Sequence, residues 1–79
     1  MLLKLESSFT FADDQNEITA NFFGRQDDFF VSVEINGEEK STLKTNEEVT
    51  AKNAFYTVFE SLQSIQGYKL KRYIYKQEG

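Results

Sequence analysis

Apolar and polar residues alternate along much of the first half of the chain. The first run, about 3–11, puts its large apolar residues on one parity: Leu3, Leu5, Phe9 and Phe11. Runs at about 18–23 and 29–35 alternate in the same way, and clusters of turn residues separate the runs at 12–17 and 24–28. A period of two is typical of strands that bury one face, so the pattern predicts three consecutive antiparallel strands.

A hairpin signal follows the third run. Asn36 and Gly37 suit a type I′ turn, because both central residues of that turn need positive φ. The next residues, about 38–44, are mostly polar, and Leu43 is their one clear candidate for the core. Because charged side chains protect an edge strand from pairing with other chains, we expect a fourth strand at the sheet edge.

The period changes between residues 45 and 67. Apolar residues recur there at steps of three and four, which is typical of an amphipathic helix. They are Ala51, Ala54, Phe55, Val58, Phe59, Leu62 and Ile65. Thr45 and Glu48 fit a capping box at the start of this helix, and Gly67 fits a stop after its end.

Residues 68–76 alternate again and predict a fifth strand. A helix about as long as the strands can return the chain to lie beside the first strand. We therefore predict an α+β fold, ββββαβ, as a single domain over residues 1–79. Its antiparallel sheet has the strand order 5-1-2-3-4, with the helix packed on one face. Besides the helix stripe, the expected core is Leu3, Leu5, Phe9, Phe11, Ile18, Ala20, Phe22, Phe29, Val31, Val33, Ile35, Leu43, Leu70 and Ile74.

The composition excludes several kinds of chemistry. The 79 residues include no cysteine and no histidine, so the chain has no disulfide, no thiolate ligand and no histidine base. No segment approaches the roughly 18 apolar residues of a membrane span, and the first residues lack the long apolar run of a secretory signal. We therefore expect an intracellular, cytoplasmic protein that does not enter a membrane.

Carboxylates occur in adjacent pairs at 13–14, 27–28, 38–39 and 47–48. Two carboxylates can divide acid and base roles, but these pairs fall in or beside expected turns and at the helix start, where acidic residues serve turn formation and capping. An EF-hand loop beginning at Asp14 would have Ile18 and Arg25 at positions that need oxygen ligands. The serines have no histidine to activate them, and the glycines are isolated. We therefore predict a protein that is not an enzyme, with no catalytic residue, cofactor or metal site.

Charge is distributed unevenly along the chain. The net charge is −4, yet residues 1–66 hold twelve acidic and five basic residues, while residues 67–79 hold one acidic and four basic. This basic end interleaves cations with aromatic rings, as single-stranded nucleic-acid sites do. The residues concerned are Tyr68, Lys69, Lys71, Arg72, Tyr73 and Tyr75. A nucleic-acid-binding strand is one interpretation, although the acidic remainder would repel phosphates. The other is an ordinary fifth strand whose cations balance acids elsewhere.

Strand parity puts four aromatic residues on the sheet face opposite the helix: Phe23, Phe30, Tyr73 and Tyr75. Large aromatic side chains on a solvated face often mark an interaction site. The alternatives are that cross-strand aromatic pairs stiffen the sheet, or that curling of the sheet buries them. Acidic residues would form the rim of this surface: Asp13, Asp14, Glu17, Asp27, Asp28 and Glu34.

These features predict a small, acidic, non-enzymatic protein-binding module whose partner has a basic surface. Such a partner is often a nucleic-acid-binding protein, whose phosphate contacts the turn carboxylates would imitate. In size and charge the chain is similar to the small acidic inhibitors that phages direct against host defence enzymes. The alternatives are the nucleic-acid binder and a homodimer or larger homo-oligomer joined through the aromatic face or an edge strand.

Overall fold

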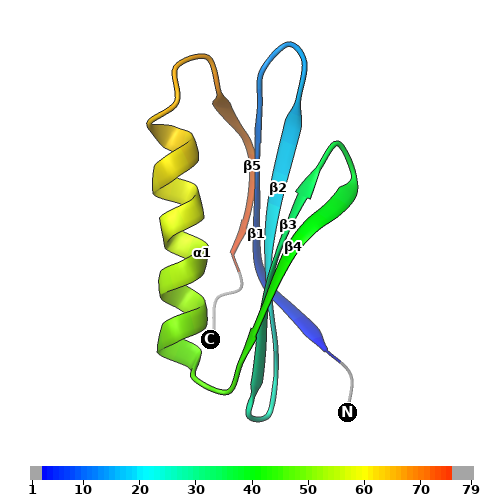
Figure 1. The fold of residues 1–79 in the computed structure, drawn as a ribbon, viewed down its shortest axis with the longest axis vertical. Helices are drawn as coiled ribbons and strands as arrows, with labels where there is room; N and C mark the ends of the chain where they lie inside the picture. The colour runs from blue at the N-terminus through cyan, green and yellow to red at the C-terminus, as the bar shows by residue number, and fades with distance from the viewer. Residues whose placement is uncertain (1–2, 76–79) are drawn as a thin grey trace.

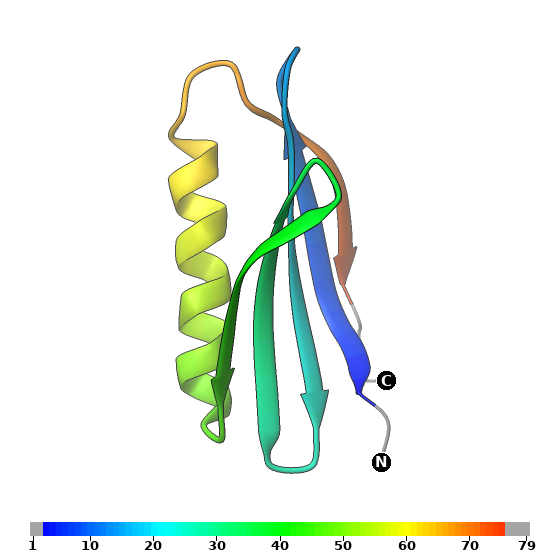
Figure 2. The ribbon, with the colours of Figure 1, turned by 45° about the vertical axis from the view of Figure 1, so that its right-hand side comes forward.

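A computed structural model describes residues 3–75 of the protein. Its elements are β1 (Lys4–Ala12), β2 (Glu17–Arg25), β3 (Asp28–Ile35), β4 (Glu38–Thr45), α1 (Glu48–Gln63) and β5 (Lys69–Tyr75). The strands form one antiparallel sheet of order β4-β3-β2-β1-β5, and α1 packs on one face (Figure 1, Figure 2). The predicted α+β fold is therefore confirmed. Residue 76, the last of the predicted fifth strand, lies outside the described residues.

The turn between β3 and β4 has the predicted geometry. Asn36 and Gly37 have φ values of 53° and 84°, and the flanking Ile35 and Glu38 are cross-strand partners. Both φ values lie in the left-handed region that a type I′ turn requires, which an Asn-Gly pair tolerates at low cost. The sequence signal thus specifies the position of this hairpin and its pairing next to the turn. Farther along, Lys40 is an extra residue, because Glu34 pairs with Glu39 and Val33 with Ser41.

The helix begins later than the capping-box pattern predicts. Thr45 is still the last residue of β4, where it pairs with Phe29, and its Oγ1 accepts a 3.1 Å hydrogen bond from the backbone N–H of Glu47. Glu47 is the N-cap residue and makes no side-chain cap. The proposed Thr45–Glu48 capping box is therefore wrong, because sheet pairing holds Thr45 in the strand. No helix within residues 3–75 is long and apolar enough to span a membrane.

The core is an aromatic layer between the sheet and α1. Its buried residues are Phe9, Phe11, Ala20, Phe22, Val31, Ala51, Phe55 and Leu62. The Phe9 ring is fully buried, and its centroid lies 4.9 Å from that of Phe55 and 5.1 Å from that of Phe59. Ring pairs of this kind stabilise a fold by about 0.5–1.5 kcal/mol each beyond the burial of their area. The layer therefore anchors the middle of α1 to the sheet.

A register shift in β1 overturns the prediction that Leu3 and Leu5 belong to the core. Leu5 pairs with Phe23, whereas Ser7 pairs with Phe22, so Glu6 is an extra residue between the two pairs. An extra residue of this kind exchanges the two faces of a strand. Leu5 consequently lies on the face opposite α1, and Leu3 and Leu5 are 44% and 41% exposed. Both residues are outside the core.

A second register shift reverses the faces predicted for residues 72–75 of β5, whereas Leu70 keeps its predicted face. Thr10 pairs with Arg72 and Phe11 with Leu70, so Lys71 is the extra residue. Tyr73, the partner of Phe9, therefore lies on the helix side of the sheet.

The same shift moves two further side chains. Tyr75, which pairs with Ser7, joins Tyr73 on the helix side, and Ile74 moves to the opposite face beside Ser8. The prediction that both tyrosines share a face with Phe23 is wrong, as is the placement of Ile74 in the core. A parity argument through the strand could not detect the bulge.

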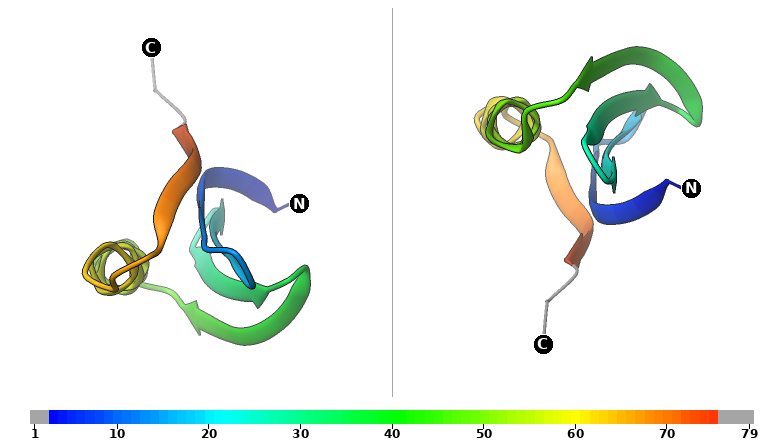
Figure 3. Two further views of the ribbon diagram at one scale, coloured as in Figure 1. Left: turned by 90° about the horizontal axis from the view of Figure 1, so that it is seen from above. Right: turned by 90° about the horizontal axis from the view of Figure 1, so that it is seen from below.

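Three further residues of the expected core are exposed because they lie at the margins of the sheet or helix. Leu43 is on edge strand β4 and Leu70 on edge strand β5, with exposed fractions of 38% and 45%. Ile65 follows the end of α1 and is 45% exposed. The views along the helix axis show that the sheet is strongly curved, and that β5 runs away from α1 toward its C-terminal end (Figure 3).

Candidate protein-interaction surfaces

Aromatic rings continue from the core onto the surface where α1 meets β5. We call this surface the α1–β5 strip and define it by Tyr56, Phe59, Tyr73 and Tyr75. The Tyr73 ring centroid lies 5.8 Å from that of Phe59 and 6.5 Å from that of Tyr75. The exposed fractions are 44% for Tyr56, 38% for Tyr73 and 61% for Tyr75. The strip is therefore a set of large, accessible rings whose inner members are held by the core.

The hydroxyl of Tyr73 reports how closely the tyrosines are grouped. Partial burial raises the pKa of Tyr73 above its ordinary value of 10.0, and the neighbouring phenols of Tyr56 and Tyr75 raise it further. Both effects oppose a negative charge on the Tyr73 oxygen. The phenol of Tyr73 is thus uncharged at neutral pH, and the side chains of Tyr56 and Tyr75 lie close enough to influence it.

β5 adds an exposed sheet edge to this strip. All seven residues of β5 are exposed, and four of them are large apolar or aromatic residues: Leu70, Tyr73, Ile74 and Tyr75. Its three cations, Lys69, Lys71 and Arg72, form no ion pair with a carboxylate of residues 3–75. The opposite edge, β4, carries charged residues and one exposed large apolar side chain, Leu43. The two sheet edges therefore differ in their capacity to bind another chain.

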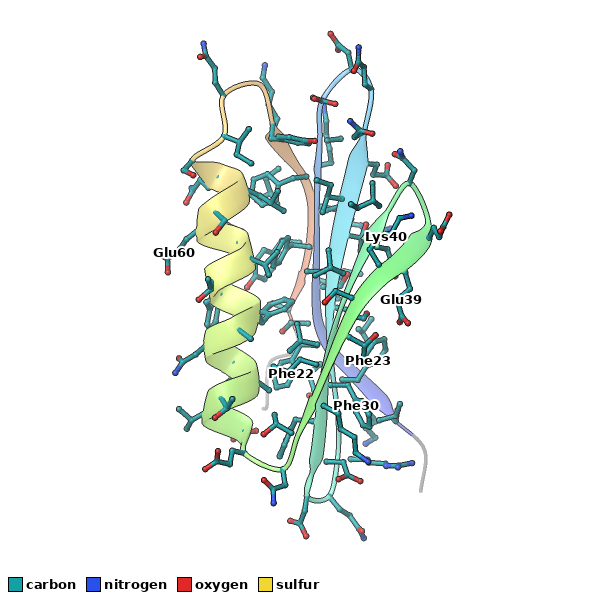
Figure 4. The ribbon with its side chains drawn as sticks, viewed as in Figure 1. Phe22, Phe23, Phe30, Glu39, Lys40 and Glu60 are labelled. Carbon is teal, nitrogen blue, oxygen red and sulfur yellow. The ribbon has the colours of Figure 1, made fainter. Side chains whose placement is uncertain are left out.

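Phe23 and Phe30 lie on the face opposite α1, as predicted. They are cross-strand partners, and Figure 4 shows both on the far side of the sheet from Phe22, which points toward the helix. Both are half-buried. The side-chain charges of Arg25 and Lys44 each lie 5.9 Å from the centroid of the Phe30 ring. Cations, rather than the predicted acidic rim, thus flank this pair of rings.

The centre of the same face holds a polar network that the sequence analysis missed. The Ser8 hydroxyl donates a 2.9 Å hydrogen bond to Oδ1 of Asn21, whose Nδ2 donates at 2.7 Å to a carboxylate oxygen of Glu34. The hydroxyls of Thr10 and Thr19 share a 2.9 Å hydrogen bond in the next row. Ser8 and Thr10 are only 2% and 4% exposed. The outward polar positions of β1, β2 and β3 are therefore largely buried and paired with one another.

The acidic residues of the predicted rim divide between the two ends of the sheet. Asp13, Asp14 and Glu17 lie at the β1–β2 turn, beside the β3–β4 turn. The side-chain amide of Asn36 joins these turns, because it donates to Asn16 at 3.1 Å and accepts from the backbone N–H of Glu17 at 2.8 Å. Glu34 lies nearby as the partner of Thr19.

The remaining two rim residues, Asp27 and Asp28, lie at the β2–β3 turn at the other end, where Asp28 forms a 3.4 Å ion pair with Arg25. No single acidic rim surrounds the four aromatic residues.

Asp13 organises the β1–β2 turn. One of its carboxylate oxygens accepts hydrogen bonds from the backbone N–H groups of Asn16, at 2.7 Å, and Gln15, at 2.8 Å. These two bonds lower the pKa of Asp13 below its ordinary value of 3.8, the bond from Asn16 contributing most. This carboxylate therefore has the turn-forming role expected for the paired acids.

The basic and aromatic residues of the nucleic-acid hypothesis are separated by the fold. Tyr68 packs against the core, and Tyr73 and Tyr75 lie on the helix side. Lys71 and Arg72 instead line a shallow pocket of about 190 Å³ with Thr10 and Glu17. A phosphate in that pocket would meet the Glu17 carboxylate, and the bases could not stack on Tyr73 from there. Within residues 3–75, no three carboxylates converge on a point that could hold a metal ion.

Comparison with known proteins adds no relative. The chain matches no protein-family model, no curated protein and no solved structure at a significant level.

Tyr56 is a residue of the strip that the sequence analysis overlooked. It is next to Phe55 but off the apolar stripe of the helix, so the period of the stripe assigns it to solvent. Tyr56 lies three residues before Phe59, and residues three apart are neighbours on a helix surface. This spacing was the one sequence signal that Tyr56 borders the apolar stripe.

Proposed function

We propose that the chain is a small, non-enzymatic protein-binding module that contacts its partner through the α1–β5 strip. The observation that carries the proposal is the continuity of the rings from the buried Phe9 through Tyr73 to the exposed Tyr75. Binding energy at protein interfaces concentrates in well-packed aromatic residues, and tyrosine is among the commonest of them. A monomer has no need to expose so many large rings side by side.

Rigidity supports the choice of this surface over the opposite face. Tyr73 is held by ring contacts with Phe9 and Phe59, so binding would cost little of its conformational freedom. Phe23 and Phe30 on the opposite face are half-buried and flanked by Arg25 and Lys44, which already cover part of the Phe30 ring. The strip therefore offers more rigid aromatic area that is still accessible.

Capture of a partner with matched variants tests the proposal. The bait is the purified protein in nuclease-treated lysate of its native host, compared with the Tyr56→Ala, Tyr75→Ala double variant. We expect this variant to retain its fold and to lose most of the captured protein. A Lys40→Ala variant on the other edge of the sheet is the control and should capture as the wild type does (Figure 4). Undiminished capture by the double variant would contradict the proposal.

A second candidate function is inhibition of a nucleic-acid-binding protein by its acidic turns, in the manner of phage anti-defence inhibitors. Two hydrogen bonds of the Asn36 side chain favour this function, because they hold the β1–β2 turn against the β3–β4 turn. Asp13, Asp14 and Glu17 therefore lie together at one end of the sheet. Phe23 and Phe30 would then be the anchors, and the partner surface would be basic. In this case Asp13→Asn with Asp14→Asn would weaken capture, and the strip variant would not.

The capture experiment also tests the alternative that the chain binds nucleic acid. Lys69, Lys71 and Arg72 have no ion-pair partner within residues 3–75, and Lys71 and Arg72 line their shallow pocket together with Glu17. If nucleic acid rather than protein is retained when nuclease is omitted, and if retention falls steeply with salt, the basic strand is the working surface.

A further inference from the structure

The outer edge of β5 has no strand beside it in the described part of the chain. The sheet ends at β5, whose inner edge pairs with β1. The outer N–H and C=O groups of such a strand are a ready template for another extended chain. Because α1 packs mainly against β1 to β4, and β5 runs away from it, the helix leaves this edge accessible (Figure 3).

Charge determines what kind of strand this edge would accept. Three of its seven residues are cations, Lys69, Lys71 and Arg72, and none has an ion-pair partner within residues 3–75. In an antiparallel pairing of two copies of β5 centred on Arg72, that residue would face its own copy. Like charges directly opposite one another destabilise strand pairs, so the strand disfavours a second copy of itself. An acidic strand would instead neutralise the cations.

The side chains of β5 specify the rest of the partner. Tyr73 and Tyr75 project on the helix side and Ile74 on the other, so both faces of an added strand would meet a large apolar neighbour. Such cross-strand apolar pairs contribute to strand addition, while the backbone hydrogen bonds supply affinity. The occupant that fits is therefore an extended segment with carboxylates and large apolar residues in alternation.

From this edge, its charge and its side chains, we infer that β5 adds an acidic extended segment of a partner protein as a sixth strand of the sheet. The inference rests on the proposed function and deepens it, since the added strand would lie against Tyr73 and Tyr75 of the α1–β5 strip. It pairs Lys69, Lys71 and Arg72, which form no ion pair within residues 3–75, with carboxylates of the partner. The acidic character of the remaining chain would then act to keep other acidic proteins from binding elsewhere.

The test uses capped peptides as long as β5, seven residues, in which glutamate alternates with valine, and a counterpart with lysine in place of glutamate. Each is titrated into the isotope-labelled full chain and followed by amide NMR shifts and hydrogen exchange. We expect the glutamate peptide to shift and protect β5 amides, and the lysine peptide to bind about tenfold more weakly or not at all.

Charge variants distinguish binding at the β5 edge from a general effect of the net charge of the protein. Lys71→Glu with Arg72→Glu should weaken binding of the glutamate peptide by about tenfold or more, and the gentler Lys71→Gln with Arg72→Gln should weaken it by a smaller factor. The matched control, Lys40→Glu with Lys44→Glu, makes the same change of net charge on β4 and should leave binding unchanged. Equal binding of both peptides, shifts centred on Phe23 and Phe30, or no binding of the glutamate peptide would each overturn the inference.

Two outcomes distinguish this inference from the proposed function. Failure of the glutamate peptide, while the Tyr56→Ala, Tyr75→Ala variant still loses its captured partner, refutes the strand addition alone. Binding of the peptide with undiminished partner capture by that variant refutes the role of the strip and supports the edge. Light scattering of the free protein at high concentration should give the mass of a monomer. A dimer whose β5 amides are protected from hydrogen exchange would overturn the inference, because a second copy of the chain would then occupy the edge.

Discussion

The ring of Tyr73 stacks on the ring of Phe9, with centroids 6.3 Å apart and planes inclined by 24°. Phe9 is fully buried, whereas Tyr73 is 38% exposed. One ring contact thus connects the core to the surface that we propose for partner binding. Core packing fixes the orientation of an accessible side chain, which is what a low-entropy contact residue requires.

The two tyrosines of β5 should contribute very differently to stability. Tyr73→Ala removes contacts with Phe9 and Phe59, so we expect it to lower the free energy of unfolding by about 1–3 kcal/mol. Tyr75→Ala removes a side chain that is 61% exposed, and it should change stability by less than about 0.5 kcal/mol. Urea denaturation of both variants checks this difference, and equal losses would show that Tyr75 is packed.

The polar network on the open face should contribute measurably to stability. Asn21→Ala removes the acceptor of the Ser8 hydroxyl and the donor to Glu34, and it leaves the nearly buried Ser8 hydroxyl unpaired. We expect a loss of about 1–3 kcal/mol in the free energy of unfolding. Asn53→Ala, on the exposed side of α1, is the control and should be neutral or slightly stabilising. A neutral Asn21→Ala would mean that water replaces the network without cost.

Acid should reveal the role of Asp13 in the β1–β2 turn. Its folded-state pKa is lowered by the backbone N–H groups of Asn16 and Gln15, so its ionised form stabilises the fold above the ordinary value of 3.8. That contribution is lost as pH falls through the lowered folded-state pKa. Asp13→Ala should therefore be less stable than the wild type at neutral pH, and the difference should shrink in acid.

Asp14→Ala is the control for the acid series, because Asp14 makes no hydrogen bond with residues 3–75. Denaturation midpoints between about pH 2 and pH 7 supply the measurement. A difference between Asp13→Ala and the wild type that stays constant over this range would show that the turn does not depend on the carboxylate charge.

Alkali should test the grouping of the tyrosines. Burial, with the phenols of Tyr56 and Tyr75, raises the folded-state pKa of Tyr73 above 10.0. Its protonated form therefore favours the folded state, fully so below the unfolded-state pKa, and this stability is lost as pH rises through the raised folded-state pKa. Tyr73→Phe cannot ionise and should lose less stability across this range. Tyrosinate absorbance during a pH titration gives the ionisation directly, and identical alkaline profiles for the two proteins would contradict the burial of Tyr73.

The sequence was sufficient to predict the strands, the helix and the strand order, because each depends on periodicity and on tight connections. The Asn36–Gly37 turn even specified its own geometry. The face of each side chain depends on register, and here the sequence failed twice. The extra residues Glu6 and Lys71 are β-bulges, and each exchanges the faces of the side chains on its two sides. Neither is a glycine or a proline, so the sequence contains no signal for a bulge at these positions.

The residues that make up the candidate site differ from the predicted set for the same reason. Parity placed Tyr73 and Tyr75 with Phe23 and Phe30, whereas the bulge at Lys71 moves the tyrosines to the helix side, where they join Tyr56. The buried polar network was equally hidden, because serine and threonine at outward positions are ordinarily solvated. Only the packing of neighbouring strands shows that Ser8 and Thr10 lose contact with water.

Site-specific photo-cross-linking tests the central claim, that the α1–β5 strip contacts a partner protein, most directly. A benzophenone amino acid replaces Tyr75 in one variant and Lys40, on the opposite edge of the sheet, in the other. Irradiation in the native host should produce one dominant protein adduct from position 75, and little or none from position 40. Equal adducts from both positions, or an adduct from position 40 alone, would contradict the account and return attention to the acidic turns and the open face.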